Sequence, residues 1–380
     1  RGALSNDRAT PTRGTKNMQS IFSSLVRERK TSFSFPLSLE NNMNKMKIAF
    51  FEIESWEKDY LQSQLKDFDL IFFEEKLNED NLKNIKDINI LSPFTYSIID
   101  KKFIDSLKSL KYVSTRSTGF DHIDLKVCKK NNILVSNVPT YGENTVAEHT
   151  FALILTLSRK IYSSLERTKK DDFSMEGLTG FDLKGKILGV VGVGNIGKHV
   201  IRIAKGFGMQ VLAYDIKKDQ KLAKRVGFKY VTLDYLFKNS DITTFHLPYN
   251  KSTHHLVNIE TLKLFKKDSY LINTSRGGIC DTTALLQGLK DKTFAGLGLD
   301  VLEEECFIKE ERELITPDFS KKCDLKTILE NHILINQPNV IITPHNAFNS
   351  KEALIRIIDT TIENIKSFSK NKLINIIKHG

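Results

Sequence analysis

A glycine-rich turn between a predicted strand and a predicted helix limits this chain to a small set of folds. The apolar run Ile187–Val191 has the length of a buried strand, and a helical pattern begins soon after it. Gly192, Gly194 and Gly197 lie between the two at the spacing G-x-G-x-x-G. The first glycine permits the tight turn, the second lets the backbone approach a pyrophosphate, and the third lets the helix pack closely on the strand. Together with the free N–H groups at the helix start, this context predicts a dinucleotide-binding turn.

An acidic residue beyond the turn narrows the predicted cofactor. Asp215 directly follows the next predicted strand, Gln210–Tyr214, and lies about 20 residues after the glycines. A carboxylate there can accept hydrogen bonds from both ribose hydroxyls, and it would repel a 2′-phosphate. The sequence therefore predicts NAD rather than NADP.

The length and charge of the chain suggest a protein of ordinary globular type. Its 380 residues correspond to about two domains. The formal net charge of +11 raises the question of a nucleic-acid partner. Because the lysines are interleaved with acidic residues instead of forming one stripe, we expect a solvated lysine-rich surface and no nucleic-acid partner.

The cysteines and apolar runs indicate a cytoplasmic location. The four cysteines, Cys128, Cys280, Cys306 and Cys323, form no C-x-x-C pair and have no histidine cluster nearby. We therefore expect free thiols in a reducing compartment and no metal site. The most apolar run, Phe151–Leu157, is too short to span a membrane, so no membrane partner is expected.

Residues 1–42 differ in composition from the rest of the chain. They are polar and rich in Ser, Thr and Asn, and they hold more basic than acidic residues. Such a segment resembles an organelle transit peptide. We favour the alternative of a disordered or non-native extension ahead of a start at Met43 or Met46.

From Lys47 onward, apolar runs alternate with helical patterns. This rhythm predicts a doubly wound parallel sheet, an α/β fold. Ser55 is the predicted N-cap of the first helix, and an acidic, irregular stretch is expected from Glu303 to about Asn336. The predicted strands cover 47–51, 70–73, 88–91, 111–115, 133–136, 187–191, 210–214, 241–248, 269–273, 295–301 and 340–343, and the predicted helices cover 55–66, 101–110, 145–160, 199–204, 283–290 and 351–370.

The predicted helix over 145–160 carries too many apolar residues for an exposed helix. We expect it to pack against another domain or another subunit.

Three polar residues lie at the carboxyl ends of predicted strands of the second half: Arg276, Asp300 and His345. Taken singly, each has an ordinary interpretation: a surface salt bridge, a turn cap and a loop histidine. In open α/β sheets, however, ligands bind at the carboxyl ends of the strands. Together these residues offer a cation, a carboxylate and an acid/base group beside a nucleotide turn, as a hydride-transfer site requires.

The chain resembles the D-isomer-specific 2-hydroxyacid dehydrogenases. Seven motifs occur in the family's order over about residues 46–380: Thr115–Asp124 (TRSTGFDHID), Asn137–His149 (NVPTYGENTVAEH), Gly189–Gly197 (GVVGVGNIG), His246–Pro248 (HLP), Ile272–Gly277 (INTSRG), Gly298–Val301 (GLDV) and Ile342–Phe348 (ITPHNAF). Within the family, the resemblance favours the D-lactate dehydrogenases.

The resemblance implies two Rossmann-like doubly wound domains. A flavodoxin-like substrate domain would be discontinuous, with residues 46–140 and 347–380, and an NAD-binding Rossmann domain would span 141–346. The family is usually dimeric, so a homodimer is expected, with the helix after Thr145 as the candidate interface.

The resemblance also implies the catalytic residues. Arg276 would bind the substrate carboxylate, His345 would be the acid/base, and Glu305 would orient His345. Glu305 matches the family's glutamate by its position five residues after Asp300. Glu303 and Glu304 are adjacent, so which of the three faces His345 stays open.

Further binding residues follow from the same motif matches. The implied cofactor-binding residues are Gly192, Gly194, Asn195, Ile196, Gly197, Asp215, Leu247, Pro248, Thr253, Thr274, Ser275, Arg276 and Asp300. The implied substrate-binding residues are Tyr96, Thr118, Gly119, Tyr141, Arg276 and Phe348. The aromatic residues among them favour a small 2-oxoacid with an apolar side chain over phosphoglycerate.

Three alternatives stay open at this point. One is a dehydrogenase of a bulkier acid such as 2-hydroxyisocaproate. Another is a formate dehydrogenase of the same superfamily, which Glu305 disfavours because those enzymes carry Gln there. The third is an NAD-sensing corepressor-like binding protein built on the same fold.

Overall fold

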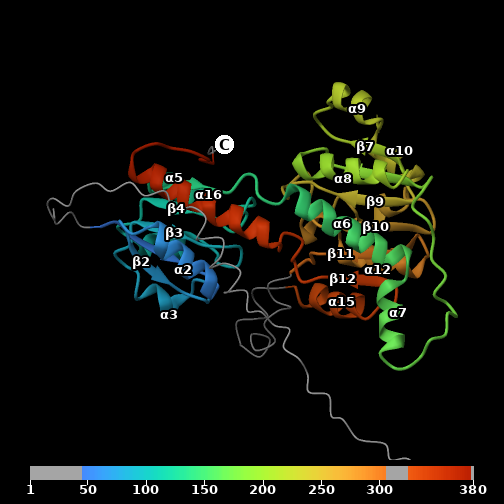
Figure 1. Cartoon of the computed structure of the whole chain (residues 1–380), viewed down its shortest axis with the longest axis horizontal. Coiled ribbons are helices and arrows are strands. Elements are labelled where there is room, and N and C mark those ends of the chain that lie inside the picture. Colours follow the sequence, from blue (N-terminus) through green and yellow to red (C-terminus); the bar gives the residue numbers. More distant parts are fainter. Residues whose placement is uncertain (1–44, 305–323, 378–380) are drawn as a thin grey trace, which may run out of the picture.

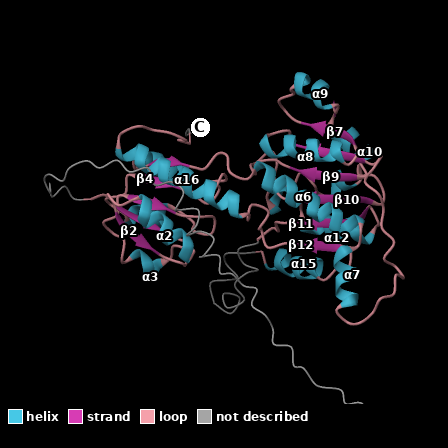
Figure 2. Cartoon of the chain, in the orientation of Figure 1, coloured by secondary structure: helices cyan, strands magenta, loops and turns pink. Residues whose placement is uncertain are grey.

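The computed structural model describes residues 45–304 and 324–377 and places them in two parallel sheets (Figure 1). Helices cover both faces of each sheet (Figure 2). The prediction of two doubly wound α/β domains is therefore confirmed. The segment 1–42, Glu305, Cys306 and Cys323 lie outside the described residues.

The smaller sheet has the strand order β2-β1-β3-β4-β5. Its strands are β1 (Lys47–Phe50), β2 (Asp69–Phe72), β3 (Ile90–Ser92), β4 (Tyr112–Ser114) and β5 (Leu134–Ser136). Its short helices are α2 (Ser55–Gln64), α3 (Glu79–Leu82), α4 (Lys101–Ser106) and α5 (Leu125–Lys130). Buried side chains of α4 and α5 pack on one face, and Leu61 of α2 packs on the other.

The last long helix, α16 (Lys351–Ser369), returns to the smaller sheet (Figure 1). Ile358, Ile362 and Ile365 are buried against β1 and β4 beside α2. Beyond the helix, Ile376 forms an antiparallel bridge with Ser136 of β5. Both ends of the described chain thus contribute to one core, as a discontinuous domain requires; the boundaries at 140 and 347 stay predictions.

The larger sheet has the order β12-β11-β10-β9-β6-β7-β8, and all of its neighbouring strands are parallel. The strands are β6 (Ile187–Val191), β7 (Gln210–Tyr214), β8 (Lys229–Tyr230), β9 (Ile242–Phe245), β10 (Ser269–Asn273), β11 (Phe294–Leu299) and β12 (Val340–Ile342). The chain order reverses between β6 and β9. Ligands of open α/β sheets bind at such a switch point.

The helices of this part lie on the two faces of the larger sheet. They are α6 (Glu143–Ser158), α7 (Ile161–Thr168), α8 (Asn195–Gly206), α9 (Gln220–Val226), α10 (Leu233–Asn239), α11 (Ile259–Leu262), α12 (Thr282–Lys290) and α15 (Leu325–Ile335), with a 3₁₀ turn at Gly277–Ile279.

Helix α6 buries its apolar side chains within this chain. Phe151, Leu153, Ile154 and Leu157 are buried in one core with α8 and the larger sheet. The two helices lie side by side in Figure 1. The structure therefore buries these side chains within their own domain, and the packing of α6 against another subunit stays a prediction.

Three local predictions were wrong. Ser55 is not the N-cap of α2: Glu54 is, because Glu54 and Glu57 form a reciprocal capping box. The helix predicted over 101–110 ends at Ser106. The stretch expected to be irregular contains α15, which begins directly after its N-cap Asp324 and buries Ile328 and Leu334.

No helix within the described residues is long and apolar enough to cross a membrane. Within residues 45–304 and 324–377, no group of three or more His, Cys, Asp or Glu side chains could hold a metal ion.

Candidate active site

A cleft of about 680 Å³ lies at the carboxyl ends of strands from both sheets. Thr118 and Gly119 reach it after β4 of the smaller sheet, and Gly194 reaches it after β6 of the larger one. Arg276 and His345 reach it after β10 and β12. The structure therefore brings together residues that the sequence separates by more than two hundred positions.

The glycine turn leaves room for a ligand above it. Gly192 has φ +98°, a conformation that favours glycine, and a Cβ there would overlap the carbonyl of His246. A Cβ at Gly197 would overlap the carbonyl of Gly192. By contrast, a Cβ at Gly194 would meet nothing within 4 Å. Two glycines thus permit close packing, and the third faces open space at the start of α8, as a pyrophosphate would require.

Asp215 supports the turn with the same carboxylate that was predicted to bind ribose. Its Oδ2 accepts a hydrogen bond from Val193 N at 2.7 Å, and its Oδ1 accepts one from Lys217 N at 2.8 Å. These contacts fix the carboxylate at the carboxyl end of β7, beside the glycines.

Arg276 lies between the two parts of the molecule. Its Nε donates to Asp121 Oδ2 at 3.2 Å, and its Nη1 donates to the carbonyl of Ser275 at 2.8 Å. Its Nη2 lies so close to Gly119 that a Cβ there would overlap it. Since Asp121 and Gly119 follow β4 of the smaller sheet, the guanidinium is oriented by both domains.

His345 lies in a strained turn that the carboxylate of Asp300 holds. Its φ is +53°, in the left-handed region that non-glycine residues rarely adopt. Asp300 accepts hydrogen bonds from Asn346 N at 3.0 Å, from Ala347 N at 2.9 Å and from Thr343 Oγ1 at 2.5 Å. Asp300 was predicted to bind the cofactor; it lines the cleft, and the contacts that the structure gives its carboxylate orient the residues around His345.

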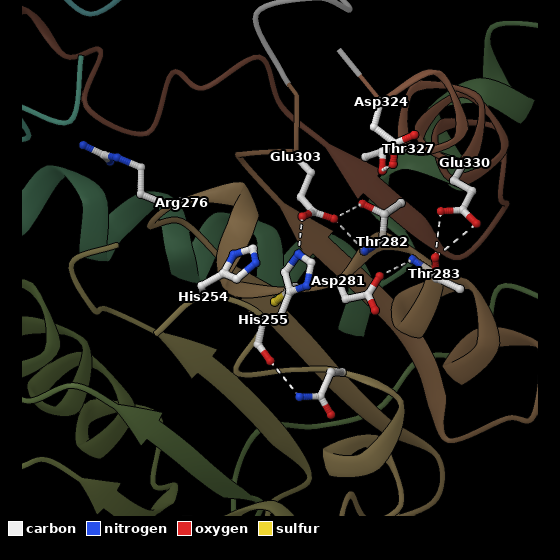
Figure 3. A network of polar contacts seen from close by, with 12 residues as sticks. His254, His255, Arg276, Asp281, Thr282, Thr283, Glu303, Asp324, Thr327 and Glu330 are labelled. Carbon is white, nitrogen blue, oxygen red and sulfur yellow. Dashed lines mark hydrogen bonds and ion pairs between the residues drawn. The ribbon is translucent and has the colours of Figure 1, made fainter. Parts of the chain in front are cut away.

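One of the three neighbouring glutamates is already engaged. Glu303 Oε1 lies 2.5 Å from His255 Nε2, and Oε2 accepts hydrogen bonds from Thr282 N and Thr282 Oγ1, both at 2.9 Å. Figure 3 shows the Glu303 carboxylate between His255 and Thr282, with Arg276 pointing away from this network. The carbonyl of Glu303 also accepts a hydrogen bond from Asn331 Nδ2 at 2.7 Å.

These contacts turn Glu303 toward α12 and α15, so it is a poor candidate for the partner of His345. Burial and the neighbouring Glu303 raise the pKa of Glu304. Glu305 stays a prediction.

Most of the other predicted site residues also line the cleft: Thr118, Tyr141, Asn195, Ile196, Leu247, Pro248, Thr274, Ser275 and Phe348. Tyr96 lines a neighbouring cavity of about 640 Å³, which shares Phe94, His345 and Phe348 with the cleft. Thr253 lies outside both cavity linings; its hydroxyl donates to the Pro248 carbonyl at 2.8 Å and holds that loop.

The sequence interpretation missed Phe94, Asp121 and His246. Phe94 follows β3, and its ring meets the ring of Phe348 edge to face with centroids 5.4 Å apart. Asp121 and His246 lie inside motifs that were recognised, but no role was assigned to them. The rule that found Arg276 considered only polar residues at strand ends; extended to aromatic residues, it would also have found Phe94.

Two histidines near the cleft are held in the neutral form. Burial lowers the pKa of His246 to about 3, and its Nδ1 has no hydrogen-bond partner within the described chain. Burial, together with the nearby Arg276 guanidinium, lowers the pKa of His122 to about 4, although Asp121 opposes the shift. Neither ring is therefore suited to donate a proton near neutral pH.

A family model described as "D-isomer specific 2-hydroxyacid dehydrogenase, NAD binding domain" matches residues 151–347. The chain belongs to the D-isomer-specific 2-hydroxyacid dehydrogenases. The protein is therefore an oxidoreductase with NAD as its cofactor, which confirms the predictions of family, enzyme class and cofactor.

Similar proteins match most of this dehydrogenase chain. A "D-lactate dehydrogenase" of Escherichia coli is 34% identical over 331 residues, which are 86% of this chain and 98% of the relative. A "2-hydroxyacid dehydrogenase homolog" of Haemophilus influenzae is 37% identical over 332 residues, again 86% and 98%. The solved D-lactate dehydrogenase of Aquifex aeolicus, complexed with NAD and lactic acid, is 38% identical with a TM-score of 0.77, over 85% of this chain and 96% of that one.

Proposed function

We propose that this dehydrogenase reduces pyruvate to D-lactate with NADH, and oxidises D-lactate in reverse. The observation that carries the proposal is the aromatic wall of the cleft that Arg276 also lines. Phe94 and Phe348 meet edge to face, and Tyr141 lines the same cleft. Such a wall favours a small apolar side chain on the substrate. The D-lactate dehydrogenases among the similar proteins support the same choice.

The roles of the residues follow from their chemistry. The planar guanidinium of Arg276 can bind the substrate carboxylate through two parallel hydrogen bonds. Thr118 and Gly119 would offer backbone N–H groups to the same carboxylate. Protonated His345 would donate its proton to the oxygen of the reduced carbonyl, and Glu305 would hold the imidazole and favour its charged form.

The residues around the glycine turn fit the cofactor. Gly194 leaves open space, and Asp215 has an orientation fixed by two backbone N–H groups. NADH, when bound, supplies the hydride. The predicted contacts of Asn195, Ile196, Leu247, Pro248, Thr274 and Ser275 would place it against the carbon that Arg276 positions.

The test is a substrate panel with the purified protein and NADH. We expect the highest kcat/KM with pyruvate, and we expect the product to be the D isomer in a stereospecific lactate assay. A large preference for 4-methyl-2-oxopentanoate would replace this proposal with the bulkier-acid alternative. Production of L-lactate, or the absence of turnover with every 2-oxoacid, would overturn it.

We further infer a cytoplasmic homodimer with the domain boundaries given above. Large apolar side chains on α7 and the loop after it are exposed: Tyr162, Leu165, Phe173 and Met175, with exposed fractions of 55, 53, 77 and 84%. A second copy of the chain is the simplest cover for this surface, which we name the α7 surface. The described cysteines, Cys128 and Cys280, are free and buried, which suits a reducing compartment.

A further inference from the structure

His149 belongs to a recognised motif, Asn137–His149, yet it has no assigned role. It lies on α6, which begins close to the junction of the two domains (Figure 1). Its side chain is only 20% exposed and points toward the ends of β11 and β12. These are the strands that carry Asp300 and the His345 turn.

The hydrogen-bond directions around His149 follow from chemistry. The Thr343 hydroxyl lies 2.5 Å from Asp300 Oδ1, and since a carboxylate only accepts, the hydroxyl donates to it. His149 Nε2 lies 3.0 Å from the same hydroxyl oxygen, so this nitrogen carries a hydrogen and donates. It also lies 3.4 Å from Asp300 Oδ1. The result is a chain of donors from α6 to one carboxylate.

That carboxylate is fully buried. Its side chain has no exposed surface, and burial of a carboxylate is costly unless donors or a cation satisfy it. Its other hydrogen bonds come from Asn346 N and Ala347 N, the two residues after His345. Among the described residues, His149 is the basic side chain that the structure pairs with Asp300.

We propose that His149 is a positioning residue for the reaction. It fixes the Thr343 hydroxyl and supports the buried Asp300, which in turn holds the left-handed turn that presents His345. A turn of this kind persists only where its surroundings over-determine it. Without His149, the turn relaxes and the imidazole of His345 leaves the orientation that proton donation needs. The inference rests on the proposed function, because it takes His345 as the proton donor.

The test compares His149→Ala with His149→Gln. Glutamine places an Nε2–H donor at a reach similar to that of the histidine Nε2, so it can restore the bond to Thr343. We expect the alanine variant to lose about tenfold in kcat with pyruvate while its KM for NADH stays within about twofold, and the glutamine variant to keep most of the activity. The matched control is Glu148→Gln on the exposed side of α6, where the carboxylate accepts a hydrogen bond from Asn144 Nδ2 at 3.1 Å.

A double-mutant cycle with Thr343→Val tests whether His149 acts through the Thr343 hydroxyl. If His149 acts through Thr343 and Asp300, His149→Ala should lower kcat little further in the valine background. Full additivity overturns the proposal. So does wild-type kcat in His149→Ala, or an equal loss in His149→Gln. His345→Gln separates the two claims. If that variant keeps wild-type kcat, His345 is not the proton donor; if it loses activity while His149→Ala keeps wild-type kcat, only the role of His149 fails.

Discussion

At the scale of single residues, the site buries ionisable groups in two opposite ways. Asp300 has no exposed side-chain surface, and it meets hydrogen-bond donors from Thr343, Asn346 and Ala347. His122 and His246 are held neutral instead, with pKa values of about 4 and 3. The Asp300 carboxylate is stabilised by hydrogen-bond donors, whereas the two histidines stay neutral.

The lowered pKa values predict how stability depends on pH. The unfolded chain protonates both histidines near pH 6.5, whereas the folded chain leaves them neutral until about pH 4 and 3. Between those values the unfolded state binds more protons, so the free energy of unfolding decreases as the pH is lowered. We expect a decrease of about 1 kcal/mol for each histidine between pH 7.5 and 5.5.

Urea titrations at the two pH values measure this decrease. His122→Asn and His246→Asn should each reduce it, and a pH dependence that both variants share with the wild type would refute the assignment.

Residue identities at the site were predictable from sequence, but their contacts were not. Arg276 and His345 follow strands in recognisable motifs, and both line the cleft. The engagement of Glu303 by His255 and Thr282 depends on loops that meet only in the folded chain. For the same reason, the sequence chose Glu305 only by its position in the motif and left Glu303 and Glu304 open.

At the scale of elements, the turn between β6 and α8 separates two uses of glycine. A side chain at Gly197 would collide with the backbone of the turn, whereas one at Gly194 would face open space. The lack of a side chain at Gly197 is therefore needed for folding, and the lack of one at Gly194 leaves room for the ligand. The spacing G-x-G-x-x-G already assigned close packing to Gly197 and ligand approach to Gly194, and the structure adds the atoms that a side chain at each position would meet.

Alanine substitutions test the distinction. Gly197→Ala should reduce the free energy of unfolding by about 1–3 kcal/mol through overpacking. Gly194→Ala should leave stability close to that of the wild type and raise the KM for NADH, because its methyl group occupies the space above the turn. Gly206→Ala near the end of α8, where a Cβ also meets nothing, is the control for added helix propensity. Equal stabilities of Gly194→Ala and Gly197→Ala would contradict this division.

Strands and long helices were predicted well because their apolar residues are periodic and buried. Helix α7 was missed although Ile161 and Leu165 recur at helical spacing, because the helix is short; none of its residues is buried within the described chain. Helix α15 was missed because its apolar residues are not confined to one side: Ile328 and Leu334 are buried, whereas Leu329 is exposed. The sequence therefore shows no clear amphipathic pattern there.

At the scale of the whole molecule, the α7 surface predicts the oligomeric state. Leu165→Glu combined with Met175→Glu places two charges on it and should convert a homodimer to a monomer in light scattering after size-exclusion chromatography. Tyr235→Glu on α10 is the matched control, since Tyr235 is as exposed as Leu165, both at 53%. A wild-type protein that is monomeric at micromolar concentration would refute the dimer, and a double variant that stays dimeric would place the interface elsewhere.

The chain passes between the two domains twice, near residue 140 and near residue 347. Helix α16, which follows the second passage, binds the segment of the first. Arg356 Nε of α16 donates to the Tyr141 carbonyl at 2.5 Å, and Asn364 Nδ2 donates to the Asn137 carbonyl at 3.0 Å. His345 lies on the second crossing, a few residues before α16 begins at Lys351. A rotation of the smaller domain on this paired hinge would therefore move Gly119 and Asp121 relative to Arg276 while bending the backbone beside His345. Closing the cleft and orienting His345 would then be one movement.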